Sequence, residues 1–369
     1  MSVVLNLLDC GQSLWLDYID RNLVSNGGLK QLVGSGIQGV TSNPTIFHKA
    51  ISGSKDYDDT IRDLIQGDHE IDEATLYHWL TIEDVQMAAD ALRSVYDSSH
   101  GVDGYVSLEV SPHLAYNTSA TVESARRLWS AVSRPNLMIK VPSTKQGLPA
   151  ISHLIGEGIN VNATLLFSSS RFEEVAQAYI RGLAVHPNPR AVASVASFFI
   201  SRVDTKVDQI LEKIGTPQAL KLKGKIAIAN AKVAYRKFQE IIKTEAFLEQ
   251  KQRGARTQRP LWASTGTKNP AFSDVLYVDS LIGPDTVNTV PLNTLDAFQH
   301  HGEVRKTLTA DLDVAYRHLE QLQALGVNLD EITQQLEDEG VAAFADSYDQ
   351  LLTTLRDKRS QVAKDYALS

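Results

Sequence analysis

Residues 137–141 read LMIKV, and residues 191–199 read AVASVASFF; both runs are almost continuously apolar. Strands with one face in water alternate apolar and polar residues, whereas near-continuous apolar runs are typical of strands buried on both faces of a parallel sheet. Segments with the 3.6-residue period of helices, such as 75–96 and 120–132, lie between runs of this kind. The sequence therefore predicts parallel strands covered by helices.

Eight strand candidates can be identified along the chain. In chain order they are LWLD at 14–17, IQGVTSN at 37–43, GYVSLEV at 104–110, LMIKV at 137–141, INVNATL at 159–165, AVASVASFF at 191–199, PLWAST at 260–265 and VLYVDSLI at 275–282. Eight alternations of strand and helix favour an α/β fold with a single (β/α)8 TIM barrel over an open doubly wound sheet. Another α/β enzyme fold is the alternative.

The chain beyond the strands predicts three further features. A Ser170-x-x-Glu173 capping box indicates a helix start, and the link 265–275 has room only for a turn or a single helical turn. Periodic apolar residues from 304 onward predict extra C-terminal helices, outside the barrel or over one end. We expect a barrel domain over 1–300 and C-terminal helices over 301–369, packed on the same domain.

Composition narrows the function classes. The 369 residues carry a formal charge of −8 and no long basic run, which argues against a nucleic-acid partner. The uncharged stretches 158–170 and 191–201 fall well short of the roughly 20 residues that a membrane span needs. The N-terminus has no basic leader, and the single cysteine, Cys10, cannot form an intrachain disulfide. These observations predict a cytoplasmic protein with no membrane partner.

One glycine motif has two interpretations. Gly34, Gly36 and Gly39 match G-x-G-x-x-G, which binds dinucleotides only where a strand precedes it and a helix follows. Here a helical stretch precedes the motif and a strand-like stretch follows it. The glycines are therefore expected to end a helix and turn the chain into a strand.

Lys140 is the most informative residue for chemistry. It lies within LMIKV, where a charged amine would be costly unless it is paired or neutral. Burial favours the neutral form of an amine, and a neutral amine is the nucleophile that attacks a carbonyl. A lysine that forms a Schiff base and a structural, ion-paired lysine are both compatible with this position.

Polar residues at the ends of the apolar strands favour the chemical interpretation. The C-terminal strand ends of a parallel barrel form its active site, so side chains there should converge. The residues in question are Asp17, Asn43, Glu109, Lys140, Asn162, Thr164, Ser197 and Ser264. Taken singly, Asp17 could cap a helix, Asn43 could form a turn, Glu109 could be a rim charge and Ser197 could fill the core. Two carboxylates near a lysine would supply the acid and base that imine chemistry needs.

Two cations follow predicted strands. Arg202 lies where the sixth strand passes into its helix, and a guanidinium at a helix start suits a phosphate ester. The alternative is a surface arginine paired with Asp204. Lys268 could add a second cation, or it could be an exposed loop lysine.

Six stretches of the chain together resemble the transaldolase family. They are GVTSNPTIF at 39–47, SLEVSP at 107–112, NLMIKVPST at 136–144, INVNATLLFS at 159–168, SFFISRVD at 197–204 and WASTGTKNP at 262–270. The resemblance runs from Asp17 to about Asn288, and the chain length is similar to the longer bacterial-type members.

The resemblance implies a transferase of the non-oxidative pentose phosphate pathway without cofactor or metal. Lys140 would form a Schiff base with a ketose phosphate (sedoheptulose 7-phosphate or fructose 6-phosphate) and pass a dihydroxyacetone unit to an aldose phosphate (glyceraldehyde 3-phosphate or erythrose 4-phosphate). In the family pattern, Asp17 is the base at the cleaved bond, and Glu109 and Thr164 position and activate water. Substrate contacts would come from Asn43, Asn162, Ser197, Arg202 and Ser264.

The chain departs from the family pattern in places. Gly266 occupies a position that is Arg in many members, so Lys268 is the next candidate cation, and Pro142 after Lys140 is unusual. Two rival functions stay open: a related class I aldolase that releases dihydroxyacetone, and a non-catalytic sugar-phosphate binding protein. Small sugar phosphates are the expected partners; one sequence leaves the oligomeric state undetermined.

Overall fold

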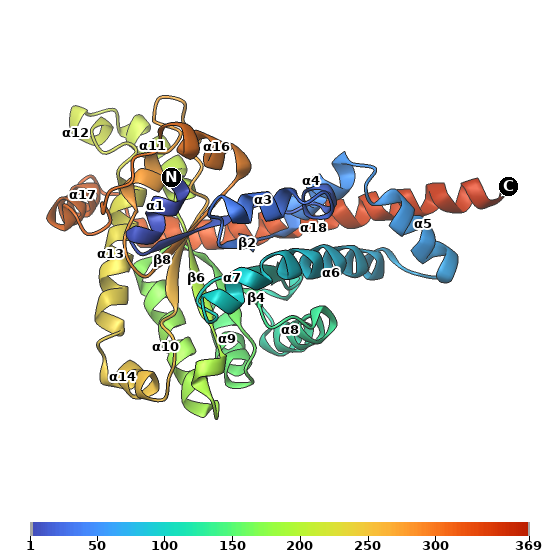
Figure 1. Ribbon diagram of the computed structural model, residues 1–369. Helices are drawn as coiled ribbons and strands as arrows, with labels where there is room; N and C mark the ends of the chain where they lie inside the picture. The colour runs from blue at the N-terminus through green and yellow to red at the C-terminus, as the bar shows by residue number, and fades with distance from the viewer. Residues whose placement is uncertain (1–2, 368–369) are drawn as a thin grey trace.

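The computed structural model describes residues 3–367, and its central element is a closed barrel of parallel strands (Figure 1). Each strand pairs with the next in sequence, and the last closes the barrel by pairing with the first, as Gln12↔Thr286 to Leu16↔Val290. The strands are β1 Gln12–Leu16, β2 Gly39–Thr41, β3 Tyr105–Glu109, β4 Leu137–Pro142, β5 Val161–Leu166, β6 Ser194–Phe199, β7 Arg259–Ala263 and β8 Thr286–Val290. The prediction of a TIM barrel is confirmed.

Helices surround the barrel and extend beyond it. They are α1 Val3–Asp9, α2 Arg21–Ser25, α3 Gly28–Gly34, α4 Pro44–Gly53, α5 Asp58–Gly67, α6 Glu73–Ala91, α7 Arg93–Ser98, α8 Thr118–Val132, α9 Gly147–Gly156, α10 Ser169–Val185, α11 Ser201–Ile214, α12 Pro217–Leu220, α13 Ile226–Ile241, α14 Glu245–Gln252, α15 Leu276–Ser280, α16 Leu292–His301, α17 Leu312–Ala324 and α18 Leu329–Ala367, with 3-10 turns η1 Pro112–Leu114 and η2 Pro189–Ala191. No helix within residues 3–367 is both long and apolar enough to cross a bilayer.

The eighth strand was predicted at the wrong place. The apolar run 275–282 contains the short helix α15, and β8 is the later segment TVNTV. Every residue of β8 is buried, yet three of its five side chains are polar, so a search for apolar runs passes over it. Its polar side chains form hydrogen bonds with other residues of the barrel. Gln12 Nε2 donates to the Thr286 hydroxyl at 2.9 Å, and the Thr265 hydroxyl donates to Asn288 Oδ1 at 2.9 Å. The link after β7 is nevertheless short of a full helix, as expected.

The start of α10 also differs from the prediction. Ser168, not Ser170, is the N-cap residue, and its hydroxyl accepts a hydrogen bond from the Arg171 backbone N–H at 3.1 Å. Three serines precede Arg171, and the sequence pattern selected the wrong one because a Glu follows Ser170 at the capping-box spacing.

The glycine motif has the predicted structural role. Gly34 ends α3, Gly36 has a φ of +118°, and Gly39 begins β2. A Cβ atom at Gly39 would lie 2.5 Å from the Trp15 ring, so only glycine lets β2 lie this close to the buried indole.

The C-terminal tail forms two helices, α17 and α18. The periodicity predicted helix from residue 304 onward, but residues 304–311 are not helical. The long α18 runs beside α4, α5 and α6 towards the C-terminus (Figure 1). It also contacts β5 and α11, so it lies over the C-terminal end of the barrel. The predicted C-terminal helices are thus present, and one of them reaches the strand ends where the predicted site lies.

Candidate active site

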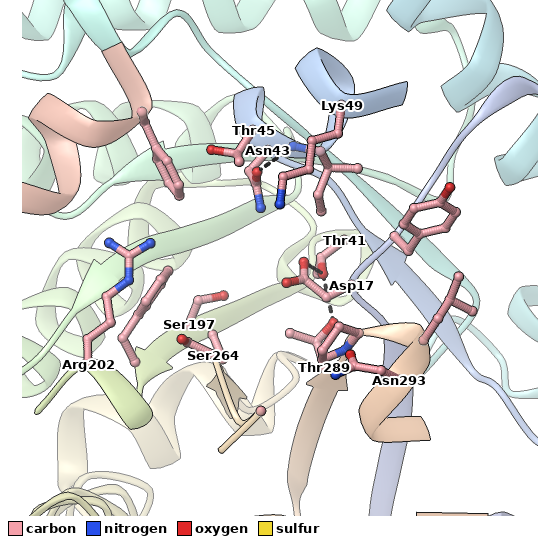
Figure 2. Close-up of a pocket in the computed structure, with 18 of the residues that line it drawn as sticks. Asp17, Thr41, Asn43, Thr45, Lys49, Ser197, Arg202, Ser264, Thr289 and Asn293 are labelled. Carbon is pink, nitrogen blue, oxygen red and sulfur yellow. Dashed lines mark hydrogen bonds between the residues drawn. The ribbon is translucent and has the colours of Figure 1, made fainter. Parts of the chain in front are cut away.

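A cavity of about 520 Å³ opens at the C-terminal ends of the strands (Figure 2). Seven of the ten predicted site residues line it, namely Asp17, Asn43, Lys140, Ser197, Arg202, Ser264 and Lys268. The other three, Glu109, Asn162 and Thr164, are buried on β3 and β5, the strands on either side of β4. Side chains as far apart in sequence as Asp17 and Lys268 are therefore gathered around one end of the barrel.

Lys140 and Glu109 form a buried pair. They are register neighbours on β4 and β3, and Lys140 Nζ lies 3.5 Å from Glu109 Oε2, with the two side chains only 5% and 2% exposed. Lys140 Nζ also donates a hydrogen bond to the Ser42 carbonyl at 3.2 Å. Burial raises the pKa of Glu109 to about 7, although the nearby Lys140 opposes this rise. Glu109 can therefore both accept and donate a proton near neutral pH.

Asp17 follows β1 and lies across the cavity from Arg202 (Figure 2). Its carboxylate accepts a hydrogen bond from the Thr41 hydroxyl at 2.7 Å. Burial raises the pKa of Asp17, while the charge of Lys140 and the Thr41 hydrogen bond lower it. The N-cap of α2 is Asp20, so Asp17 is not the helix cap that was its alternative interpretation.

Asn162 links two other strands by hydrogen bonds. Its Nδ2 group donates to Ser107 Oγ at 3.0 Å, and its Oδ1 accepts from Ser197 Oγ at 2.6 Å. Ser197 is therefore held in a polar chain and is not core filler. Two residues beyond Asn162, the buried Thr164 hydroxyl has no hydrogen-bond partner among the described residues. The next residue, Leu165, has a φ of +62°, which is rare for a branched side chain and occurs where β5 loses its regular register.

Asn43 has a structural contact as well as a place in the cavity. Its Oδ1 accepts from the Ile46 backbone N–H at 3.0 Å and caps α4, which begins with Pro44. The cap occupies the oxygen, so the amide N–H groups remain to donate to a ligand.

Arg202 lies in the first turn of α11, as predicted. Among the described residues, Arg202 forms no ion pair with Asp204. The Asp204 carboxylate instead accepts hydrogen bonds from the Ala227 backbone N–H at 2.7 Å and the Tyr277 hydroxyl at 3.0 Å. Burial lowers the pKa of Arg202. A guanidinium that faces the cavity without a carboxylate partner favours an anionic ligand.

The loop after β7 borders the same part of the cavity. Ser264 has a φ of +55°, and its hydroxyl lies 3.0 Å from that of Ser201 at the start of α11. Lys268 is exposed and also lines the cavity, together with Gly266. The interpretations of Lys268 as a loop lysine and as a second cation are thus compatible.

Sequence reasoning missed several residues around the cavity. They include Thr41, Lys49, Phe199, Thr289, Asn293 and Phe344. Lys49 projects towards the cavity from α4, opposite Arg202 (Figure 2). Phe344 comes from α18, and nothing in its sequence surroundings distinguishes it from the other apolar residues of a long helix.

No cluster of three His, Cys, Asp or Glu side chains with the arrangement of metal ligands is found within residues 3–367. A reaction without metal or cofactor stays a prediction.

Comparison with known proteins adds an independent line of evidence. A family model described as "Transaldolase/Fructose-6-phosphate aldolase" matches residues 14–355. The chain is 47% identical to a transaldolase of Parafrankia sp. (strain EAN1pec) over 97% of this chain and 98% of the relative. It is 46% identical to a transaldolase of Thermobifida fusca (strain YX), with 94% and 95% covered, and 42% identical to one of Trichodesmium erythraeum (strain IMS101), with 96% and 97% covered. The chain therefore belongs to the transaldolase/fructose-6-phosphate aldolase family of enzymes.

Proposed function

We propose that this enzyme, a transferase of the transaldolase class, moves a dihydroxyacetone unit from a ketose phosphate to an aldose phosphate through a Schiff base on Lys140. The observation that carries the proposal is the buried Lys140 amine, 3.5 Å from Glu109, in the same cavity as Arg202, a cation that has no carboxylate partner among the described residues. A site that only bound sugar phosphates would need no amine nucleophile between two carboxylates.

In the first half of the reaction, the neutral Lys140 amine adds to the ketose carbonyl, and loss of water gives an iminium ion. Asp17 takes the proton of the hydroxyl on the carbon that will become the aldehyde. The carbon–carbon bond then breaks, and its electron pair moves into the iminium to form an enamine. The aldose phosphate leaves, and the three-carbon unit stays on Lys140.

In the second half, the enamine carbon attacks the aldehyde of an acceptor, and Asp17 returns the proton. Hydrolysis of the new iminium needs a water molecule and proton transfers near Lys140. Glu109, with a pKa of about 7, suits these transfers. The carboxylate oxygens of Glu109 and the Thr164 hydroxyl are buried without hydrogen-bond partners among the described residues, which supports a bound water molecule between strands β3 and β5.

The part of the cavity that Arg202 lines would bind the phosphate. Arg202 supplies the guanidinium, Ser264 a hydroxyl and Lys268 a second positive charge. The donor's hydroxyl groups nearest Lys140 would contact Asn43 and the chain formed by Asn162 and Ser197. A cytoplasmic location is part of the same proposal, supported by the single cysteine.

Borohydride reduction tests the mechanism directly. The protein is incubated with fructose 6-phosphate, reduced and digested, and peptide masses locate any adduct. A three-carbon adduct on Lys140 is expected, and Lys140→Ala should abolish both the adduct and turnover while keeping the far-UV circular dichroism of the folded barrel. No adduct on Lys140 in folded wild-type protein would refute the Schiff-base proposal.

The family description also includes fructose-6-phosphate aldolase, so an aldolase is the second candidate function. Erythrose 4-phosphate and glyceraldehyde 3-phosphate distinguish the two. Capture of the three-carbon unit by these acceptors identifies a transferase, whereas free dihydroxyacetone formed at the same rate with and without an acceptor identifies an aldolase.

A further inference from the structure

Helix α18 is fixed over the cavity by polar contacts on two sides. Glu337 forms a buried ion pair with Arg171 of α10, at 3.1 Å. Ser347, further along α18, lies 2.8 Å from the hydroxyl of Thr45, a cavity residue at the start of α4. The part of α18 between these contacts is thus held against the C-terminal end of the barrel.

A glycine brings α18 close to the strand that carries Asn162 and Thr164. A Cβ atom at Gly340 would lie 2.9 Å from Leu165 Cδ2 and 3.7 Å from an Arg202 guanidinium nitrogen. Residues four apart share a helix face, so Phe344 points to the same side of α18 as Gly340. The close approach at Gly340 places the Phe344 ring at the cavity.

The Phe344 ring lies close to both the Lys140 amine and the Arg202 guanidinium. Its centroid lies 5.7 Å from Lys140 Nζ and 5.8 Å from the central guanidinium carbon of Arg202. Phe344 is only 3% exposed although it lines the cavity. One apolar ring therefore covers the amine that would carry the enamine and the guanidinium that would bind the phosphate.

We propose that Phe344 is a positioning residue that determines specificity: it keeps water away from the enamine on Lys140, so that the three-carbon unit is transferred and not released. This inference rests on the proposed function. Release requires a proton from solvent on the enamine carbon, which gives an iminium ion. A water oxygen then adds to the iminium carbon, the carbon–nitrogen bond breaks, and the products are dihydroxyacetone and the Lys140 amine. Transfer also ends in hydrolysis of an iminium ion, so the step that only release needs is protonation of the enamine carbon by solvent. An apolar ring beside Nζ keeps solvent from that carbon and slows this step.

The experiment measures two rates on the same protein with fructose 6-phosphate as donor. One is the release of free dihydroxyacetone without an acceptor, and the other is transfer to glyceraldehyde 3-phosphate. We expect Phe344→Ala to raise the ratio of release to transfer by about tenfold, which corresponds to about 1.4 kcal/mol between the two barriers. Phe344→Leu keeps most of the apolar volume and should raise the ratio less.

Leu351→Ala is the matched control, because Leu351 is a fully buried apolar residue of α18 that does not line the cavity. Leu351→Ala should lower the stability of the protein by weakening the packing of α18, and it should leave the ratio of release to transfer unchanged. An unchanged ratio in both Phe344 variants, or an equal rise in Leu351→Ala, would overturn the inference. If Phe344→Ala does not fold, the Phe344→Leu result decides. Borohydride trapping on wild-type Lys140 is run beside these assays, so failure of the Schiff-base proposal would be recognised separately.

Discussion

Glu109→Gln should remove a pH-dependent loss of stability. Burial raises the pKa of Glu109 from its ordinary value of 4.5 to about 7. The folded protein thus holds this proton more tightly than the unfolded chain, and wild-type stability should fall as the pH rises from about 4.5 to about 7. At about 1.4 kcal/mol per pH unit, the loss is about 3 kcal/mol. The side chain is almost fully buried, so solvent screening reduces this value little.

Urea unfolding of both proteins between pH 5 and pH 8 measures the effect. The variant's free energy of unfolding minus that of the wild type should increase by about 2 to 3 kcal/mol over this range. The test is how this difference changes with pH and not its absolute value, because loss of the Glu109 contact with Lys140 also shifts the variant's free energy of unfolding at every pH. Glu123→Gln is the control, since that side chain is 68% exposed on α8 and its replacement should stay within about 0.5 kcal/mol of wild type. A difference that is flat with pH, or that decreases, would refute the reasoning about Glu109.

Three further variants test other parts of the structure. Arg202→Ala should raise KM for phosphorylated sugars at least about tenfold, because it removes a charge-assisted contact, and steady-state kinetics would contradict a phosphate role if KM did not change. Glu337→Ala should destabilise the protein by about 2 to 3 kcal/mol in urea unfolding by leaving the buried Arg171 without this partner; a loss below about 0.5 kcal/mol would show that the pair does not hold α18 in place. Ser168→Ala should cost about 1 kcal/mol as loss of an N-cap, and Ser170→Ala should cost less; the reverse order in thermal unfolding would restore Ser170 as the cap.

The location of the candidate site could be predicted from the sequence, because single polar or charged residues interrupt otherwise apolar runs. Lys140 is conspicuous because it is a charged residue in the middle of the apolar run LMIKV, and Asp17 and Glu109 lie at the ends of runs of the same kind. The C-terminal ends of parallel strands lie at one end of a barrel, so the positions of these residues in the sequence already predict that their side chains lie close together. The register Glu109↔Lys140↔Asn162 then places three of these residues side by side.

Local patterns failed where the deciding partners are distant in sequence. Strand β8 carries Thr and Asn side chains, which are tolerated in the barrel because other strands supply hydrogen bonds, as Gln12 of β1 does for Thr286 and Thr41 of β2 for Thr289. The apolar run of α15, in contrast, is buried as a helix. The N-cap of α10 is Ser168 because the backbone conformation brings its hydroxyl within hydrogen-bond distance of the Arg171 N–H. Neither choice is visible in a window of a few residues.

The sequence by itself thus determined the barrel class, the candidate lysine Lys140 and the candidate residues at the strand ends, because hydrophobic periodicity and isolated charges are local signals. Only the tertiary structure decided the electrostatic state of Glu109 and the position of Phe344. The first depends on complete burial beside Lys140, and the second on a helix that returns over the barrel and approaches it closely at Gly340. Both are properties of packing between distant segments, and packing is specified by the whole fold.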